Sequence, residues 1–229
     1  MNIEILQLID GAKKARGVTV IIDVFRAFTV EAYLTDAGAR KIIPIGDINL
    51  AYKLKEENPD ILLVGERHGK ICEGFDLGNS PSQIVGKDFS GKTVVHTTSA
   101  GTQGIANAKN ADVILTASLT NAKAVAEYIK LLNPTDVSLV CMGLEGAAET
   151  QEDTLCAEYI KSILKGNPIK LTDRIENLRV TSGAKFFDKK QSEVFPTEDF
   201  YLSTKVDIFP FVLRLTDSEL PYVEKIDVL

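Results

Sequence analysis

Short runs of apolar, β-branched residues alternate along most of the chain with longer segments in which apolar residues recur every three or four positions. The short runs favour buried strands, and the longer repeat favours amphipathic helices. The predicted strands are Val18–Asp23, Lys41–Ile45, Ile61–Val64, Thr93–Thr97, Asp112–Thr116 and Val137–Met142, and the predicted helices are Thr29–Ala37, Asp47–Glu57, Gly101–Lys109, Asn121–Leu132 and Gln151–Leu164. This alternation predicts an α/β fold in which a mainly parallel sheet is flanked by helices.

The pattern changes towards the end of the chain. A helical repeat is expected over Thr172–Phe187, a polar stretch follows it, and two strand-like runs come last, at Phe209–Leu215 and Tyr222–Val228. We therefore expect residues 1–166 to form the main α/β region and residues 167–229 to form a smaller α/β C-terminal lobe or extension.

Charge and composition limit the classes of partner. The 229 residues carry 26 Lys and Arg against 32 Asp and Glu, a net charge of −6, and no basic run offsets this charge. Such a chain repels nucleic acid and anionic lipid, so we expect neither as a partner, while a homodimer stays open. The first apolar run is cut by Asp23, and Glu4 stands where a secretory signal carries positive charge, which favours a cytoplasmic protein. Three cysteines without C-x-x-C spacing indicate reduced thiols.

Polar residues follow several of the predicted strands directly. In an open parallel sheet, ligands bind beyond the carboxyl ends of the strands. Any one polar residue there has an ordinary explanation as a helix cap or turn residue, but several such strand ends converge on one edge. The residues concerned include Asp23, Arg26, Glu66, Arg67, His68, Thr97, Thr98, Ser99, Ser118, Asn121, Glu152 and Asp153.

Two motifs suggest other phosphate chemistry. The segment Gly86–Thr93 fits the P-loop pattern, but a strand follows it where a helix should begin, so we interpret it as a turn. Arg67, His68 and Gly69 match the core of histidine phosphatases, in which the imidazole attacks phosphorus. That chemistry usually needs a second histidine, and His96 falls within a strand pattern typical of a buried structural residue. No cysteine has an arginine six positions later, which excludes cysteine phosphatase chemistry.

Carboxylates dominate the candidate metal ligands. Two histidines and no paired cysteines argue against zinc, whereas hard oxygen ligands suit Mg²⁺. Adjacent acids at the start of a helix also complement its dipole, which is an alternative explanation for the pair at 152 and 153. The candidate carboxylates are Asp23, Glu66, Asp76, Glu149, Glu152 and Asp153.

Six segments taken in order resemble the 2-phosphosulfolactate phosphatases of the ComB family. They span about residues 18 to 160, and each is weak alone. They are Val20–Ala27, Gly65–Arg67, Gly74–Pro81, Thr97–Thr102, Ala117–Ala122 and Glu152–Ala157. The resemblance implies a two-lobed α/β fold, with a phosphate-ester site in the first region. It also implies an Mg²⁺-dependent phosphatase that converts 2-phospho-3-sulfolactate to 3-sulfolactate and phosphate, a step in coenzyme M synthesis.

The resemblance, together with the chemistry of the side chains, suggests roles for individual residues. Asp23, Glu66 and Asp153 are the candidate catalytic residues, and Asp23, Glu152 and Asp153 are the candidate ligands of Mg²⁺. A small anionic phosphorylated substrate would be bound by planar guanidinium groups and by hydroxyl and backbone donors. The residues expected to bind it are Arg26, Arg67, Asn79, Ser80, Thr97, Thr98, Ser99, Gly101, Thr102, Ser118 and Asn121.

The nucleophile and two alternative functions stay open at this point. Aspartyl-phosphate phosphatases carry Asp-x-Asp, but position 25 is Phe25, which favours attack by water over attack by Asp23. One alternative is a metal-independent histidine-type phosphatase that uses His68. The other is a binder of phosphorylated acids without catalytic activity.

Overall fold

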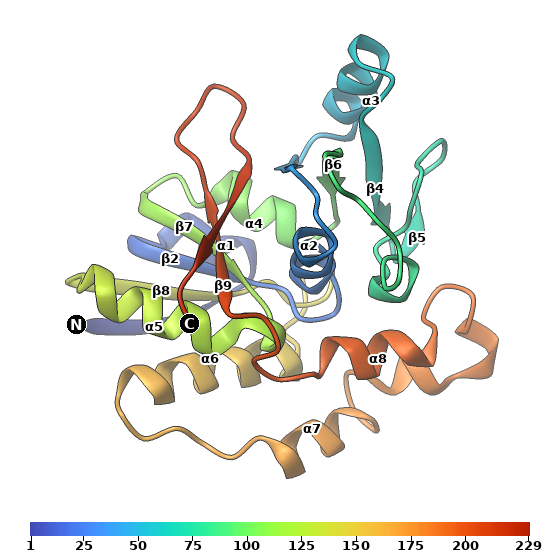
Figure 1. Cartoon of the computed structure of the whole chain (residues 1–229). Coiled ribbons are helices and arrows are strands. Elements are labelled where there is room, and N and C mark those ends of the chain that lie inside the picture. The colour runs from blue at the N-terminus through green and yellow to red at the C-terminus, as the bar shows by residue number, and fades with distance from the viewer.

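The computed structural model describes residues 1–229 and contains one ten-stranded sheet. Its strands lie in the order β1-β8-β2-β7-β9-β10-β3-β6-β4-β5 (Figure 1). The strands are β1 Asn2–Gln7, β2 Gly17–Ile22, β3 Lys41–Pro44, β4 Leu62–Arg67, β5 Lys70–Ile71, β6 Thr93–Thr97, β7 Ala111–Ala117, β8 Asp136–Cys141, β9 Phe211–Leu215 and β10 Val223–Asp227. The helices are α1 Leu8–Lys14, α2 Ala27–Asp36, α3 Ile48–Glu57, α4 Gly101–Asn107, α5 Ala122–Leu132, α6 Gln151–Leu164, α7 Thr172–Leu178 and α8 Thr197–Ser203.

The sheet has two parallel sections joined by an antiparallel hairpin. Strands β1, β8, β2 and β7 form one parallel section, and β3, β6 and β4 form the other. The C-terminal strands β9 and β10 lie between them and pair antiparallel with β7 and β3. The predicted α/β fold with a mainly parallel sheet is therefore confirmed. The division of the chain at residue 166 stays a prediction, although the last strands are an integral part of the sheet.

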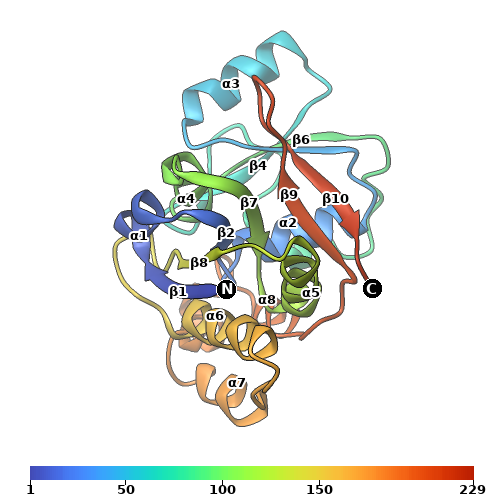
Figure 2. The ribbon, with the colours of Figure 1, turned by 90° about the vertical axis from the view of Figure 1, so that its left-hand side faces the viewer.

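Helices cover both faces of the first parallel section, as Figure 2 shows. Alternate residues of β2 point to opposite faces, as the pleat of a strand requires. Val20 and Ile22 pack in the core under α5 and α6, whereas Ile21 packs with residues of α1 and α4. Because both faces are covered, β2 is buried along almost its whole length, which explains the mostly apolar run at this strand in the sequence.

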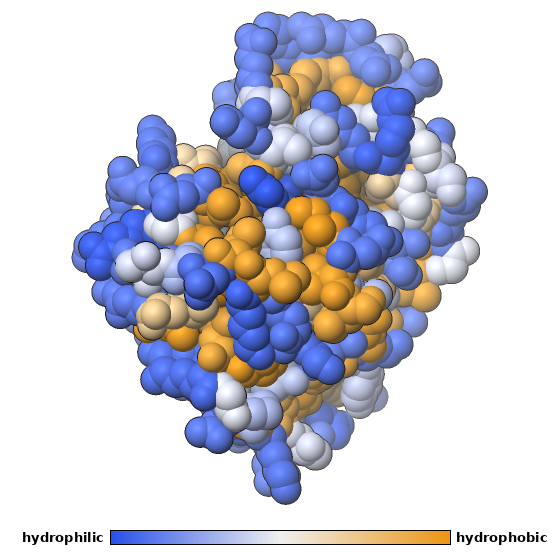
Figure 3. All heavy atoms as spheres, turned by 60° about the vertical axis from the view of Figure 1, so that its left-hand side comes forward, coloured by the Kyte–Doolittle hydropathy of each residue, from blue (hydrophilic) through white to orange (hydrophobic).

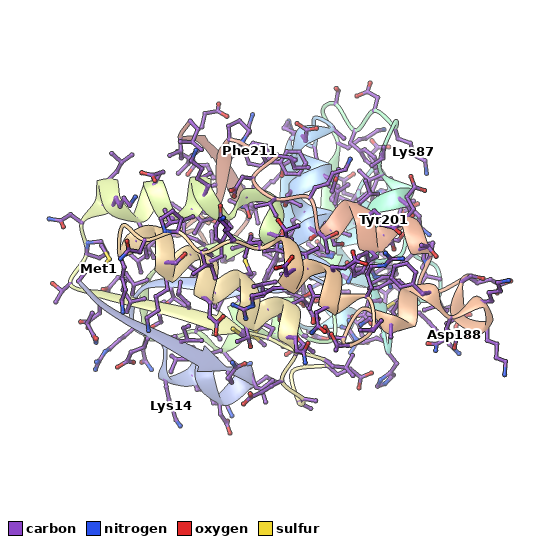
Figure 4. The ribbon with its side chains drawn as sticks, turned by 90° about the horizontal axis from the view of Figure 1, so that it is seen from below. Met1, Lys14, Lys87, Asp188, Tyr201 and Phe211 are labelled. Atoms are coloured by element: carbon purple, nitrogen blue, oxygen red, sulfur yellow. The ribbon has the colours of Figure 1, made fainter.

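The C-terminal third differs from its sequence pattern. The predicted helix Thr172–Phe187 is interrupted: α7 ends at Leu178, and a 3-10 turn, η3, covers Ala184–Phe187. Gly183 lies at the break, where an added Cβ would be 2.7 Å from the Leu178 carbonyl oxygen and 2.6 Å from the Phe200 ring. The polar stretch that follows ends in α8, which packs against η3. This segment includes Asp188, which lies at the end of the molecule opposite Met1 (Figure 4).

The surface carries exposed apolar side chains among charged ones. Figure 3 shows hydrophobic residues gathered in a band across one face, with hydrophilic residues around it. None of the helices combines the length and apolar character that crossing a lipid bilayer requires. A homodimer, which the sequence leaves open, stays a hypothesis.

Candidate functional site

A cavity of about 110 Å³ lies where β2, β4, β6 and β8 end. This is the edge of the sheet at which open α/β folds bind ligands. Its lining residues are Asp23, Phe25, Arg26, Glu66, His68, Gly69, Asn79, Ser99, Ala100, Gly143, Leu144, Glu145, Lys185 and Phe195. A larger groove of about 640 Å³ lies between α6 and α7, but the charged residues that line it are exposed. Buried charged side chains mark the smaller cavity as the candidate site.

Asp23 follows β2 and is the buried carboxylate in the wall of this cavity. Its Oδ1 accepts a hydrogen bond from Ala27 N at 3.1 Å. Burial raises the pKa of Asp23 to about 7, and the negative charges of Glu66 and Glu152 raise it further. The hydrogen bond from Ala27 N acts in the opposite direction and lowers this pKa. The chain leaves room for this carboxylate at Gly101, where an added Cβ would lie 3.0 Å from Asp23 Oδ2.

Two further carboxylates hold the loops around the cavity. Glu66 accepts hydrogen bonds from Ser99 N and Gly69 N, both at 2.6 Å, and therefore joins the loops after β6 and β4. Asp153 accepts from Val24 N and Gly143 N, both at 2.8 Å, and therefore joins the loops after β2 and β8. These bonds fix the loops that carry the other site residues.

Negative charge accumulates behind the cavity at the first turn of α6. Burial raises the pKa of Asp153 well above its usual value, and the charges of Glu152 and Asp23 add to the effect. The Oε2 atom of Glu152 is buried and has no hydrogen-bond partner in the protein. A buried carboxylate oxygen without a partner is costly, so a cation beside Glu152 would relieve this cost.

Two cations face the acids. The Nη1 atom of Arg26 donates to Asp199 Oδ2 at 2.6 Å and to the Val194 carbonyl at 2.9 Å, which leaves Nη2 and Nε without a protein partner. Lys185 projects from η3, with its ammonium 5.2 Å from the centre of the Phe195 ring. Burial lowers the pKa of Lys185, which the negative charge of Glu152 partly offsets. Sequence analysis missed Lys185 and Asp199, because no motif or strand end marks them.

The structure brings only some of the predicted substrate-binding residues to the cavity. Arg26, Asn79 and Ser99 line it, as do the predicted catalytic residues Asp23 and Glu66. The predicted residues Glu152 and Asp153 lie outside the lining, at the start of α6, and Gly101 lies outside it at the start of α4. The remaining predicted residues also lie outside it and bond to the protein. Arg67 Nη2 donates to Thr97 Oγ1 at 2.8 Å, Ser80 donates to Asp199, Thr98 and Thr102 bond to each other, and Ser118 and Asn121 form a capping box before α5.

The residues of the alternative phosphate motifs lie in other environments. His68 is exposed at the rim, with its Nδ1 2.9 Å from Glu145 Oε1. His96 is fully buried, as expected of a structural residue, with its Nδ1 3.0 Å from Glu31 Oε1. Lys92 is exposed, and β6 follows it in place of the helix that a P-loop needs. The P-loop pattern is therefore a turn that enters a strand.

A sequence model of the 2-phosphosulpholactate phosphatase family matches residues 3–217 of the chain. The chain belongs to this family. It is 34% identical over 212 residues to a probable 2-phosphosulfolactate phosphatase of Bacillus subtilis, a match that covers 91% of this chain and 92% of the relative. A protein with the same description from Carboxydothermus hydrogenoformans is 39% identical, over 76% of this chain and 72% of its own length. Another, from Thermoplasma volcanium, is 29% identical, over 94% of this chain and 98% of its own length.

Family membership confirms the resemblance carried by the six short segments. It identifies the chain as an enzyme of the phosphoric monoester hydrolase class. The cavity that holds Asp23, Arg26 and Lys185 is the candidate active site, since it combines buried acids with cations that suit a phosphorylated ligand.

Proposed function

We propose that this enzyme is an Mg²⁺-dependent phosphatase that hydrolyses 2-phospho-3-sulfolactate to 3-sulfolactate and phosphate. We place the reaction in the cytoplasm, as a step in coenzyme M synthesis. The observation that carries the proposal is the meeting of Asp23 and Glu66 with Arg26 and Lys185 in one small cavity. The names of the relatives support the choice of substrate.

The two cations suit a substrate that carries several negative charges. The guanidinium of Arg26 is held from one side by Asp199 and Val194, so Nη2 and Nε remain to bind two oxygens of one anionic group. No carboxylate lies within ion-pair distance of the Lys185 ammonium, so its charge is available to a second anionic group. A phosphorylated acid with a carboxylate and a sulfonate meets both requirements.

The acids behind the cavity fit a magnesium ion. No three His, Cys, Asp or Glu side chains converge closely enough to hold a metal by themselves. Mg²⁺ is usually held by one or two carboxylates and keeps several waters, so it does not need such a set. Asp23 and Glu152 would hold it, because Glu152 Oε2 lacks a partner while both oxygens of Asp153 accept backbone hydrogen bonds.

The ion would offset charge on the phosphoryl oxygens and lower the pKa of a bound water. The raised pKa of Asp23, about 7, means that its carboxyl group is only partly ionised at neutral pH. Oδ1 accepts the hydrogen bond from Ala27 N, which leaves Oδ2 without a protein partner. A bound cation would favour the ionised carboxylate and displace the proton. Arg26 and Lys185 then orient the substrate, and the rings of Phe25 and Phe195 limit the access of bulk water.

Phosphate release from 2-phospho-3-sulfolactate and a panel of other phosphorylated hydroxy acids tests the proposal. We expect turnover that EDTA abolishes and added Mg²⁺ restores, with the sulfonated substrate preferred. Full activity in EDTA would favour a histidine-type phosphatase that uses His68. Tight binding of the panel without turnover at any metal concentration would favour a binding protein.

A further inference from the structure

A chain of buried polar side chains leads from the cavity wall into the core of the molecule. Asn79 lines the cavity, and its Oδ1 lies 3.4 Å from His96 Nε2. The other ring nitrogen, His96 Nδ1, lies 3.0 Å from Glu31 Oε1, and Glu31 Oε2 accepts from Thr116 Oγ1 at 3.1 Å. Glu31, His96 and Thr116 are fully buried, and Asn79 is 7% exposed.

The contacts of the His96 ring show which of its nitrogens must donate to Asn79. Glu31 lies in the buried helix α2, and no Lys or Arg lies within ion-pair distance of it, so its carboxyl group bonds to His96 and Thr116. The amide oxygen of Asn79 can only accept, so Nε2–H of His96 is the donor in the contact with Asn79 Oδ1. Nδ1 shares the hydrogen bond with Glu31 Oε1 on the other side of the ring.

This arrangement fixes the direction of the Asn79 amide. Once Oδ1 accepts from His96, the Nδ2 group must face the cavity, where it has no protein partner. We propose that Glu31 and His96 are positioning residues that hold Asn79 with its Nδ2–H groups toward an anionic oxygen of the substrate. The inference rests on the proposed function, because it takes the ligand of the cavity to be an anion.

The protonation of His96 can be measured without any assay of activity. Nitrogen NMR of the full chain with ¹⁵N-labelled histidine should show a proton on Nε2 of the buried residue. His68→Ala assigns the two signals, because the chain has two histidines. A buried imidazole without a proton on Nε2 would overturn the proposal, whatever the substrate is.

Kinetics of Asn79 variants test the direction of the amide. Asn79→Ala should raise KM by about 10- to 100-fold and change kcat less, since it removes a donor to a charged group. Asn79→Asp should raise KM further, because it turns a negative oxygen toward the anion. Asn107→Asp, which adds the same charge on α4, is the control and should leave KM near that of the wild type. An Asn79→Asp enzyme with a lower KM than Asn79→Ala would show that the amide oxygen faces the cavity and would overturn the inference.

Substitution of the buried pair separates positioning from folding. His96→Leu should raise KM as Asn79→Ala does. The double variant Glu31→Gln/His96→Gln replaces the buried pair with neutral amides and places an amide donor beside Asn79 Oδ1, so it should bring KM back toward that of the wild type. Equal KM values in the wild type and in a folded His96→Leu protein would refute the positioning role. A wild type without phosphatase activity would instead refute the proposed function and leave the NMR result to decide the protonation.

Discussion

The ion pair between Arg26 and Asp199 is the buried contact whose removal has the most distinctive consequences. The side chains are 3% and 0% exposed, and Nη1 lies 2.6 Å from Oδ2. Asp199 also accepts from Ser80 Oγ at 2.9 Å and from Ser82 N at 3.0 Å. Neutralising one partner leaves the other charge buried without compensation, which costs about 3–5 kcal/mol. We therefore expect Arg26→Met and Asp199→Asn each to lower the free energy of unfolding by an amount of this order.

The double variant should behave differently in stability and in activity. Arg26→Met/Asp199→Asn contains no unpaired charge, and the Asn oxygen still accepts from Ser82 N. Its loss of stability should therefore be smaller than the two single losses added together, by about 2 kcal/mol or more. Its affinity for substrate should stay low, because the guanidinium is absent.

Urea unfolding of the four proteins gives the coupling energy, and phosphate-release kinetics give KM for each. The two single variants are compared with the double variant at one pH and one salt concentration. Strictly additive losses of stability would refute the idea that the two charges depend on each other. A double variant with the KM of the wild type would refute a role for Arg26 in substrate binding.

The remaining predictions concern Asp23, Lys185 and His68. The pKa of Asp23 is raised to about 7, so protonated Asp23 stabilises the fold fully below about pH 4, and this contribution is lost as the pH rises to about 7. The stability of Asp23→Asn relative to the wild type should therefore rise by a few kcal/mol between about pH 4 and 7, measured by urea unfolding with EDTA. A stability difference between the two proteins that does not change with pH would contradict the raised pKa. Lys185→Met should raise KM by about 10- to 100-fold with little loss of stability, whereas an unchanged KM would exclude contact with the substrate. His68→Ala should keep most of the turnover, because His68 is an exposed rim residue paired with Glu145; complete loss in a folded protein would revive the histidine-type mechanism.

The fold could be predicted where strands are buried on both faces. β2, β6 and β8 are buried along almost their whole length, and the structure places them, like β7, close to their predicted positions. β1 was missed because it lies at the edge of the sheet, where Asn2 and Glu4 are exposed and the apolar run is broken. α1 was missed because it has only seven residues and contains Gly11. Short helices and strands at the edge of the sheet have too few buried positions to give a recognisable pattern of apolar residues in the sequence.

The site could be predicted where polar residues follow strands directly. Asp23 and Glu66 lie in the cavity because the carboxyl ends of β2 and β4 meet at one edge. The same rule also selected Arg67, which bonds to Thr97 on the neighbouring strand β6, and it selected Ser118 and Asn121, which bond to each other within their own loop. The residues at strand ends include side chains that line the cavity and side chains that bond to the protein. The sequence does not show which of these two directions a given side chain takes.

The cations are the part of the site that depends on the tail of the chain. The strand ends bring four buried acids together, Asp23, Glu66, Glu152 and Asp153, and a site of this charge alone would repel an anionic substrate. The segment after α6 completes the site in two ways. The turn η3 contributes the cation Lys185, and α8 contributes Asp199, the counter-ion that orients Arg26. These residues come from short turns whose positions are set by packing on Phe200 and Phe186, a tertiary effect without periodicity in the sequence. If this cavity binds the substrate as proposed, binding depends on both parts of the chain, since residues 1–166 supply the acids and residues 167–229 supply Lys185 and Asp199, the partner of Arg26.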